Sequence, residues 1–159
     1  MSMICPEIPT NPEYPNNEIC VIALGWFWHP QRDYQDIDGV KRVVVGYTGG
    51  KQPNPTYKNI MDATESVLIE YDPTIVSYEA LLNYWANSHA PFYPTKAQYK
   101  SAIFYVNEKQ KVIAEKIVED IANKKNGVKV YTDIEAVSPF YKGEEYHQDF
   151  LNKQMSARY

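Results

Sequence analysis

Apolar and polar residues are distributed along the chain in a pattern that predicts strands and helices in turn. Strands are expected where β-branched residues cluster or alternate: residues 19–24, 40–47, 65–71 and 101–106. A helix is expected over residues 27–37, because Pro30 suits a first helical turn. A second helix should begin after Ser77, whose hydroxyl can cap it, and carries an apolar stripe that ends at Trp85.

The clearest helical signal lies in the C-terminal half. After Asn107, which can cap a helix, apolar residues recur at helical spacing until Gly127 ends the pattern. A short strand is expected over residues 128–131. Pro139 is then expected to open a final helix that runs to about Asn152.

The first six predicted elements follow the order β-α-β-β-α-β, which is typical of ferredoxin-like folds. We therefore expect an α+β protein, a two-layer sandwich with a ferredoxin-like core and appended helices. A chain of 159 residues suits one domain with one core. We expect an extended N-terminal arm over the Pro-rich residues 1–18, the domain over residues 19–152, and a C-terminal tail over residues 153–159.

Charge and composition restrict the classes of molecule that the protein is expected to bind. The formal net charge is -4 and the basic residues are dispersed, so neither nucleic acid nor a membrane surface is an expected partner. The chain contains no apolar run that is long enough to span a bilayer, and the polar N-terminal segment is unlike a secretory signal. A cytoplasmic location is the default expectation. Cys5 and Cys20 are too few for a disulfide framework and lack zinc-ligand spacing, and no cofactor is expected.

The segment from Gly25 to Trp28 stands between the first predicted strand and the first predicted helix. Backbone N–H groups and the helix dipole favour negative charge at such a corner, which suits an active site. Aromatic residues are also common there simply as a cover for the edge of a sheet. The position alone leaves both interpretations open.

Gly25-Trp26-Phe27-Trp28 resembles the Gly-Cys-Phe-Trp signature of the peptide methionine sulfoxide reductase A family. Further motifs of that family follow in the same order: Gly46-Tyr47-Thr48-Gly49-Gly50, Asn54-Pro55-Thr56-Tyr57, Glu65 with Tyr71-Asp72-Pro73, Gln98-Tyr99-Lys100-Ser101-Ala102-Ile103, Phe140-Tyr141 and Glu145-Tyr146-His147-Gln148. Several short motifs in one order, over about residues 19–151, are more specific than any single motif.

The resemblance implies a role for each residue of the signature. Trp26 stands at the position of the family's nucleophilic cysteine, whose thiolate attacks the sulfoxide sulfur. Phe27 and Trp28 match the aromatic pair that holds the substrate methyl group. A ligand similar to methionine sulfoxide is therefore the expected small-molecule partner.

Three further residues match the groups that bind the sulfoxide oxygen in the family. Glu65 matches the carboxylic acid that protonates this oxygen, and Tyr57 and Tyr99 match the phenols that donate hydrogen bonds to it. A buried carboxyl with a raised pKa beside two phenols suits such chemistry. Taken without the resemblance, Glu65 is more typical of a solvated strand end than of a catalytic acid, and either tyrosine could simply pack.

The departures from the family concern the chemistry most directly. The indole of Trp26 offers no lone pair that can attack sulfur, whereas the family's reaction needs a sulfur nucleophile. Cys20 lies six residues earlier, roughly 20 Å back along the predicted strand. Cys5 could reach the site only if the arm folded over it. No cysteine follows Cys20, and Pro94 or a neighbour stands where the family keeps an aspartate.

Four functions are therefore open to the chain. The first is a noncatalytic family member that keeps a small ligand pocket. The second is an enzyme of different chemistry that uses Glu65, Tyr57 and Tyr99, with or without a metal held by His29, His89 or His147. The third is a reductase that works through Cys5 or Cys20. The fourth is a scaffold whose former pocket is filled by the indole of Trp26.

Overall fold

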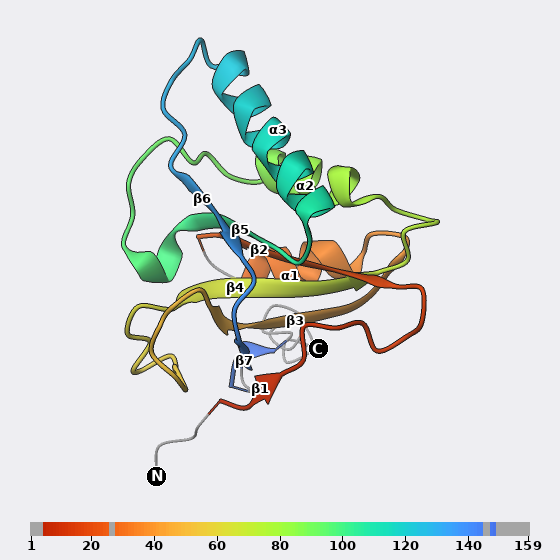
Figure 1. The fold of residues 1–159 in the computed structure, drawn as a ribbon. Helices are drawn as coiled ribbons and strands as arrows, with labels where there is room; N and C mark the ends of the chain where they lie inside the picture. The colour runs from red at the N-terminus through yellow and green to blue at the C-terminus, as the bar shows by residue number, and fades with distance from the viewer. Residues whose placement is uncertain (1–4, 26–27, 145–146, 149–159) are drawn as a thin grey trace, which may run out of the picture.

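A single seven-stranded sheet with helices on one face forms the framework of the protein. The computed structural model describes residues 5–25, 28–144 and 147–148, without the side chains of residues 28 and 29. The described elements are β1 (Glu7–Ile8), β2 (Glu18–Leu24), α1 (Trp28–Gln35), β3 (Val40–Thr48), β4 (Thr64–Tyr71), α2 (Tyr78–Asn87), the 3₁₀ helix η1 (Ala97–Tyr99), β5 (Ser101–Tyr105), α3 (Glu108–Lys124), β6 (Thr132–Ala136) and β7 (Phe140–Lys142) (Figure 1).

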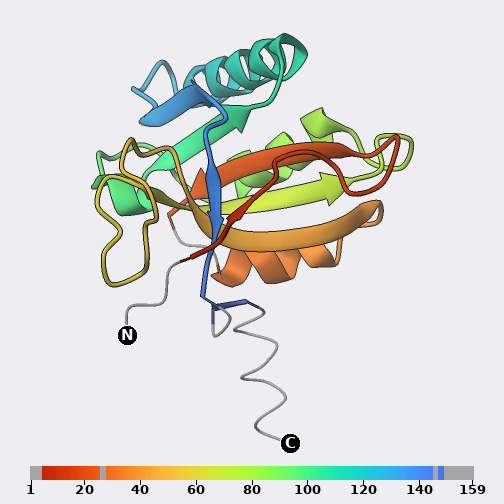
Figure 2. The same cartoon turned by 60° about the horizontal axis from the view of Figure 1, so that its bottom comes forward.

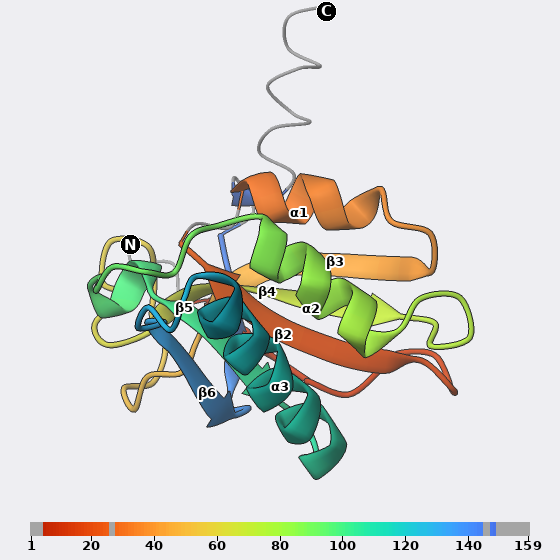
Figure 3. The ribbon, with the colours of Figure 1, turned by 90° about the horizontal axis from the view of Figure 1, so that it is seen from above.

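The strand order shows the split arrangement that the sequence predicts. The strands lie side by side in the order β1-β7-β3-β4-β2-β5-β6, and neighbours are antiparallel except for the parallel pair β5–β6. Strand β4 lies between β2 and β3, the two strands that α1 connects, as in a split β-α-β unit. Helices α1, α2 and α3 lie over the same face of the sheet (Figure 3). The predicted α+β class is confirmed.

Alternation along β2 divides the buried side chains between the two faces of the sheet. Ile22 belongs to the core under the helices, which also includes the fully buried Trp85 of α2. The indole Nε1 of Trp85 donates to the carbonyl oxygen of Ala23 at 2.9 Å, which ties α2 to the centre of the sheet. Val21 points to the opposite face, where it joins a smaller core that includes Phe104.

That opposite face is covered by the two ends of the described chain rather than by helices. Figure 2 shows the N-terminal segment and the β6–β7 connection crossing the sheet there. The two meet where β1 pairs with β7, with Glu7 opposite Tyr141 and Ile8 opposite Phe140. Because β7 also pairs with β3, the arm is joined to the sheet through backbone hydrogen bonds.

A buried carboxylate holds the second half of the arm. Glu70 of β4, whose side chain is 0% exposed, accepts the backbone N–H groups of Glu13 and Tyr14 at 2.9 and 3.2 Å. It also accepts the amide of Asn17 at 3.0 Å and the guanidinium of Arg42 at 3.1 Å. These bonds satisfy a charge that burial would otherwise make costly.

Most element predictions are confirmed, and two in the C-terminal region are wrong. The four strands that begin near residues 19, 40, 65 and 101 lie within one residue of their predicted bounds. The strand expected over residues 128–131 is instead β6, Thr132–Ala136. The preceding residues form no ladder, and the Tyr131 N–H donates to the carbonyl oxygen of Pro91 at 2.7 Å.

The helix expected from Pro139 is contradicted, because Phe140–Lys142 form strand β7. The proline at a helix start is a local signal, whereas β7 fits between β1 and β3 and fully buries Phe140, so tertiary pairing prevails. The end of that predicted helix, residues 149–152, lies outside the described residues. Across the described ranges, no helix is both long and apolar enough to cross a membrane.

Replacing Glu70 by Gln is expected to lower the free energy of unfolding at pH 7 by about 2 kcal/mol, because Arg42 and the arm lose a charged acceptor. Burial raises the pKa of Glu70, but its hydrogen bonds and Arg42 outweigh this and hold the pKa below its ordinary 4.5. The stabilisation is therefore fully present above pH 4.5 and is lost as the pH falls through the lower folded-state pKa.

Urea unfolding of both proteins at pH 7 and at pH 2 measures this effect. The difference between them should shrink at the lower pH. Glu13→Gln is the matched control, because the Glu13 side chain is 59% exposed in its ion pair with Arg42 and should contribute less than about 1 kcal/mol. Equal losses for the two variants at pH 7 would contradict the assignment.

Candidate functional site

Glu65 lies at the start of β4, opposite Tyr47 of β3 in the strand register. It is 3% exposed, and its Oε2 accepts the side-chain amide of Gln98 at 2.7 Å. The neighbouring Thr64 hydroxyl donates to the carbonyl oxygen of Ala97 at 2.7 Å. These two contacts hold η1 against the start of β4 and fix the Glu65 carboxyl in place.

Tyr99 and Tyr57 come together with Glu65 at this point. Burial raises the pKa of Tyr99, and the charge of Glu65 and a side-chain hydrogen bond with Tyr57 raise it further. Tyr99 belongs to η1, whereas Tyr57 belongs to the loop between β3 and β4. The three residues that the family resemblance singles out as oxygen-binding groups therefore converge in space, although they come from three separate segments.

Glu144 forms the other half of this polar cluster. Its Oε1 accepts the backbone N–H of Tyr57 at 3.3 Å, the hydroxyl of Tyr47 at 3.2 Å and the thiol of Cys5 at 2.9 Å. His147 packs its ring on that of Tyr57 with centroids 4.7 Å apart, and its Nε2 lies 3.4 Å from Glu144 Oε2. Glu144 thus positions Tyr57 and places a second carboxyl group near Glu65.

The protonation of Glu65 follows from this environment. Burial raises the pKa of Glu65 to about 7, the hydrogen bond from Gln98 lowers it, and the charge of Glu144 raises it. Burial and a like charge both disfavour the carboxylate. A carboxyl that titrates near neutrality can donate a proton to a ligand and take one back.

Three members of the site were not predicted from the sequence: Gln98, Tyr47 and Glu144. Gln98 and Tyr47 fall inside motifs that support the resemblance, so their positions carried a signal, but nothing local shows which side chain they contact. Glu144 becomes a neighbour of Tyr57 only because β7 adds to the sheet beside β3.

Both thiols are buried and protonated. Cys20 is 0% exposed in β2, and burial raises its pKa far above neutrality. Cys5 is 2% exposed, and burial, together with its hydrogen bond to Glu144 and the charge of that group, raises its pKa to about 12. The arm does fold toward the site, because the Lys142 N–H donates to the Pro6 carbonyl oxygen at 2.8 Å, but the thiol it brings there is not a thiolate.

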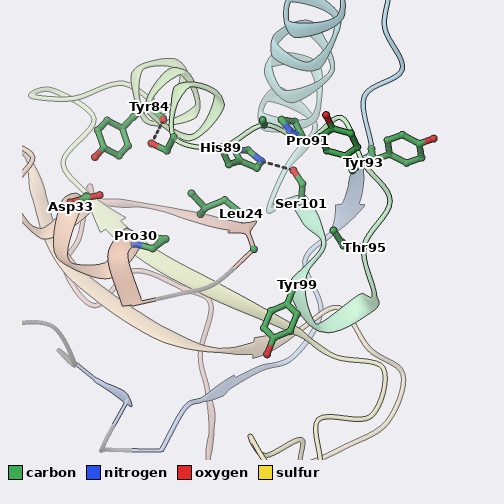
Figure 4. A pocket seen from close by; sticks show the side chains of 14 residues that line it. Leu24, Pro30, Asp33, Tyr84, His89, Pro91, Tyr93, Thr95, Tyr99 and Ser101 are labelled. Carbon is green, nitrogen blue, oxygen red and sulfur yellow. Dashed lines mark hydrogen bonds between the residues drawn. The ribbon is translucent and has the colours of Figure 1, made fainter.

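A cavity of about 490 Å³ opens at the end of β2, beside this cluster. It is lined by α1, by the end of α2 and by the segment from Ser88 to Ser101, and Tyr99 forms part of its wall (Figure 4). His89 also faces it, with Nδ1 2.8 Å from the Trp85 carbonyl oxygen and Nε2 2.8 Å from the Ser101 hydroxyl.

The structure gives the metal hypothesis no further support. Burial lowers the pKa of His89, and both of its ring nitrogens have protein partners. Among the residues that the structure describes, no group of three or more His, Cys, Asp or Glu side chains is arranged to hold a metal ion. His147 packs on Tyr57, and the side chain of His29 is not among those that the structure describes.

Three predicted site residues cannot be placed. Trp26 and Phe27 lie outside the described residues, as does the side chain of Trp28, whose backbone begins α1. Gly25 directly follows β2 and has a φ of 109°, a conformation that favours glycine, and it lines the cavity. The signature segment therefore leaves the sheet at the cavity.

Comparison with protein sequences identifies the relatives of the chain. The family model for peptide methionine sulfoxide reductase matches residues 18–159. A peptide methionine sulfoxide reductase MsrA of Sulfolobus acidocaldarius is 36% identical over 152 residues, which cover 89% of this chain and 86% of that protein. The MsrA of Nitrobacter winogradskyi is 39% identical over 145 residues, which cover 87% of this chain and 81% of that protein.

Solved structures agree with this relationship. Methionine sulfoxide reductase A of Corynebacterium diphtheriae superposes with a TM-score of 0.82 at 28% identity, over 97% of this chain and 88% of that chain. Reduced Mxr1 from Saccharomyces cerevisiae shares the fold, with a TM-score of 0.82 at 23% identity, over 91% of this chain and 90% of that chain. Because the family model and these relatives extend over most of its length, the chain belongs to the peptide methionine sulfoxide reductase family.

Proposed function

We propose that the protein binds a methyl sulfoxide group, such as that of methionine sulfoxide, at Glu65, Tyr57 and Tyr99, and that it does not reduce this group by the family's thiol chemistry. The observation that carries the proposal is the convergence of a buried carboxyl, with a pKa of about 7, on two phenol side chains. The relatives named above are reductases of methionine sulfoxide in peptides, which makes this ligand class the first choice.

The donors of the cluster suit a sulfoxide oxygen. That oxygen accepts hydrogen bonds and carries no proton of its own, so it needs donors around it. A protonated Glu65 supplies one O–H, and the hydroxyls of Tyr57 and Tyr99 can supply others. Gln98 and Glu144 hold Glu65 and Tyr57 in place before any ligand arrives, which reduces the entropy lost on binding.

Turnover needs a further component, which is a source of two electrons at the sulfur atom. In the family's chemistry a thiolate supplies them, taking up the oxygen as a sulfenic acid. Trp26 replaces that thiol in the signature, and the thiols of Cys5 and Cys20 are buried and protonated. We infer that a bound sulfoxide is held and released unchanged.

A second candidate function is acid–base catalysis on another small substrate at the same residues. The pKa of Glu65 favours it, because a group that titrates near pH 7 serves equally as acid and as base. Chemical conversion of a bound ligand without any thiol reductant, abolished in Glu65→Gln, would favour this candidate over simple binding.

The titration of Glu65 is the first test. Carboxyl ¹³C NMR should show a glutamate that titrates near pH 7, against 4.5 for an ordinary one. Glu144→Gln should lower this midpoint by removing a like charge, and Gln98→Leu should raise it by removing a donor to the carboxylate. Because the folded-state pKa is raised, Glu65 should stabilise the fold less as the pH rises from 4.5 to 7, and Glu65→Gln should lose that dependence. A midpoint below 5 would contradict the assignment.

Ligand binding should follow the same protonation. Calorimetric titration with N-acetylmethionine sulfoxide methylamide should give a dissociation constant that is at least about tenfold lower at pH 6 than at pH 8.5, because only the protonated carboxyl donates to the sulfoxide oxygen. The Glu65→Gln variant keeps a donor that does not titrate, so its affinity should vary little over this range. Absence of binding at millimolar ligand at pH 6 would remove the proposal.

Restoring the thiol tests whether the rest of the site is competent. Trp26→Cys should give reduction of a methionine (S)-sulfoxide peptide with dithiothreitol, with no activity in the unaltered protein or in Trp26→Ala. Adding Glu65→Gln to Trp26→Cys should lower the rate by about 10²-fold or more, because the oxygen loses its proton donor. Robust turnover by the unaltered protein would refute the proposed loss of thiol chemistry.

A further inference from the structure

The cavity at the end of β2 has more aromatic wall than a methyl sulfoxide needs. Four tyrosines line it: Tyr84 of α2, Tyr93 and Tyr99 on the segment before β5, and Tyr131 before β6. Its volume of about 490 Å³ lies in the range of sites that hold a whole small ligand or a large side chain. Tyr99 is common to this cavity and to the Glu65 cluster, so a group in one lies next to a group in the other.

One end of the cavity is acidic. Among the described residues that line it, Asp33 of α1 is the one with an acidic or basic side chain other than His89, whose pKa burial lowers. Figure 4 shows the Tyr84 hydroxyl directed toward Asp33, and a hydrogen bond joins the two side chains. Asp36 adds a second negative charge near Tyr84. In the described part of the chain, neither carboxylate forms an ion pair with a basic residue.

At the other end of the cavity, lysine side chains of the protein already lie over the tyrosine rings. Lys96 Nζ lies 5.2 Å from the centroid of the Tyr99 ring, and Lys129 Nζ lies 4.7 Å from that of Tyr131. Tyr84 has no such lysine among the described residues, and its ring meets that of Tyr34 edge-on, with centroids 5.0 Å apart. An aromatic face beside an unneutralised carboxylate is thus available at the Asp33 end.

The walls at this end are fixed before a ligand enters. The contact with Tyr34 and the bond to Asp33 both orient Tyr84. On the far side, the loop that carries Tyr93 is tied to the strand region by the hydrogen bond from Tyr131 N–H to Pro91. A rigid aromatic and anionic surface binds a cation with little loss of conformational entropy.

We propose that the Asp33–Tyr84 end of this cavity is a subsite for the cationic side chain of a lysine or arginine that neighbours the methionine sulfoxide in a peptide. The proposal rests on the function proposed above. The charged nitrogen lies against the Asp33 carboxylate and the ring of Tyr84, and the rest of the side chain covers Leu24 and Pro30. The protein would then select oxidised methionines in basic sequence contexts.

Calorimetric titration with four acetylated dipeptide amides tests this subsite. The first residue of each peptide is Lys or Glu, and the second is methionine sulfoxide or norleucine. At low ionic strength the Lys peptide should bind about fivefold or more tightly than the Glu peptide. Half-molar sodium chloride should reduce this ratio, because the Asp33 end is open to solvent. Peptides with the charged residue after the sulfoxide should be measured in the same way, and the preference is expected in at least one of the two orders.

Substitutions in the cavity test whether the preference for the Lys peptide arises at Asp33 and Tyr84. Asp33→Asn should bring the ratio of Lys to Glu affinities close to one and leave the binding of N-acetylmethionine sulfoxide methylamide unchanged. Tyr84→Leu should weaken the binding of the Lys peptide by a fewfold and leave the binding of the Glu peptide unchanged. It is a second test of the subsite, because it perturbs the structure in a different way from Asp33→Asn. Tyr14→Leu is the matched control, because Tyr14 is 59% exposed on the arm, outside the cavity.

The four peptides separate failure of the subsite from failure of the proposed function. Equal binding of Lys and Glu peptides in both orders, or a preference unaffected by Asp33→Asn, overturns the subsite. If the Lys preference persists and depends on Asp33, but sulfoxide and norleucine peptides bind alike, the subsite stands and the sulfoxide function falls.

Discussion

Two carboxyl groups, Glu65 and Glu144, are buried close together at one end of the sheet, and the properties of the site follow from their proximity. Each side chain is 6% exposed or less, and the charge of Glu144 disfavours ionisation of Glu65. Glu144 accepts hydrogen bonds from a thiol, a phenol and a backbone N–H, whereas the side-chain amide of Gln98 donates to Glu65. Burial and the charge of Glu144 raise the pKa of Glu65 to about 7, at the point where the two tyrosines meet.

The same environment favours hydrogen bonding by a carboxylic acid and disfavours the reactivity of a thiol. A region of low polarity and negative charge keeps a carboxylic acid protonated, which suits hydrogen bonding to a neutral oxygen. It equally keeps the thiol of Cys5 protonated, which suppresses its reactivity. Cys5 therefore lies against Glu144 yet is unsuited to replace the nucleophile that the signature lacks at Trp26. Proximity of a sulfur atom is not sufficient for reduction.

Sequence alone predicted what local patterns determine. The strands near residues 19, 40, 65 and 101 have periodic or β-branched patterns, and Ser77 and Asn107 do cap helices α2 and α3. The resemblance identified Glu65, Tyr57 and Tyr99, and the structure brings them together. Strand β7 was predicted as a helix because its conformation depends on two partner strands that are distant in sequence. The roles of Glu144 and Gln98 were missed for the same reason, since their partners lie 87 and 33 residues away.

The pairing of β1 with β7 has a consequence for how the protein is made. Glu7 lies opposite Tyr141, so the surroundings of Glu65 are complete only after residues 140–144 have been synthesised. Contacts between such distant segments form slowly, because a long loop must close before they stabilise the fold. A nascent chain from which residue 144 has not yet emerged therefore holds Glu65 and Tyr57 without the contacts of Glu144, and these three residues come together late in synthesis.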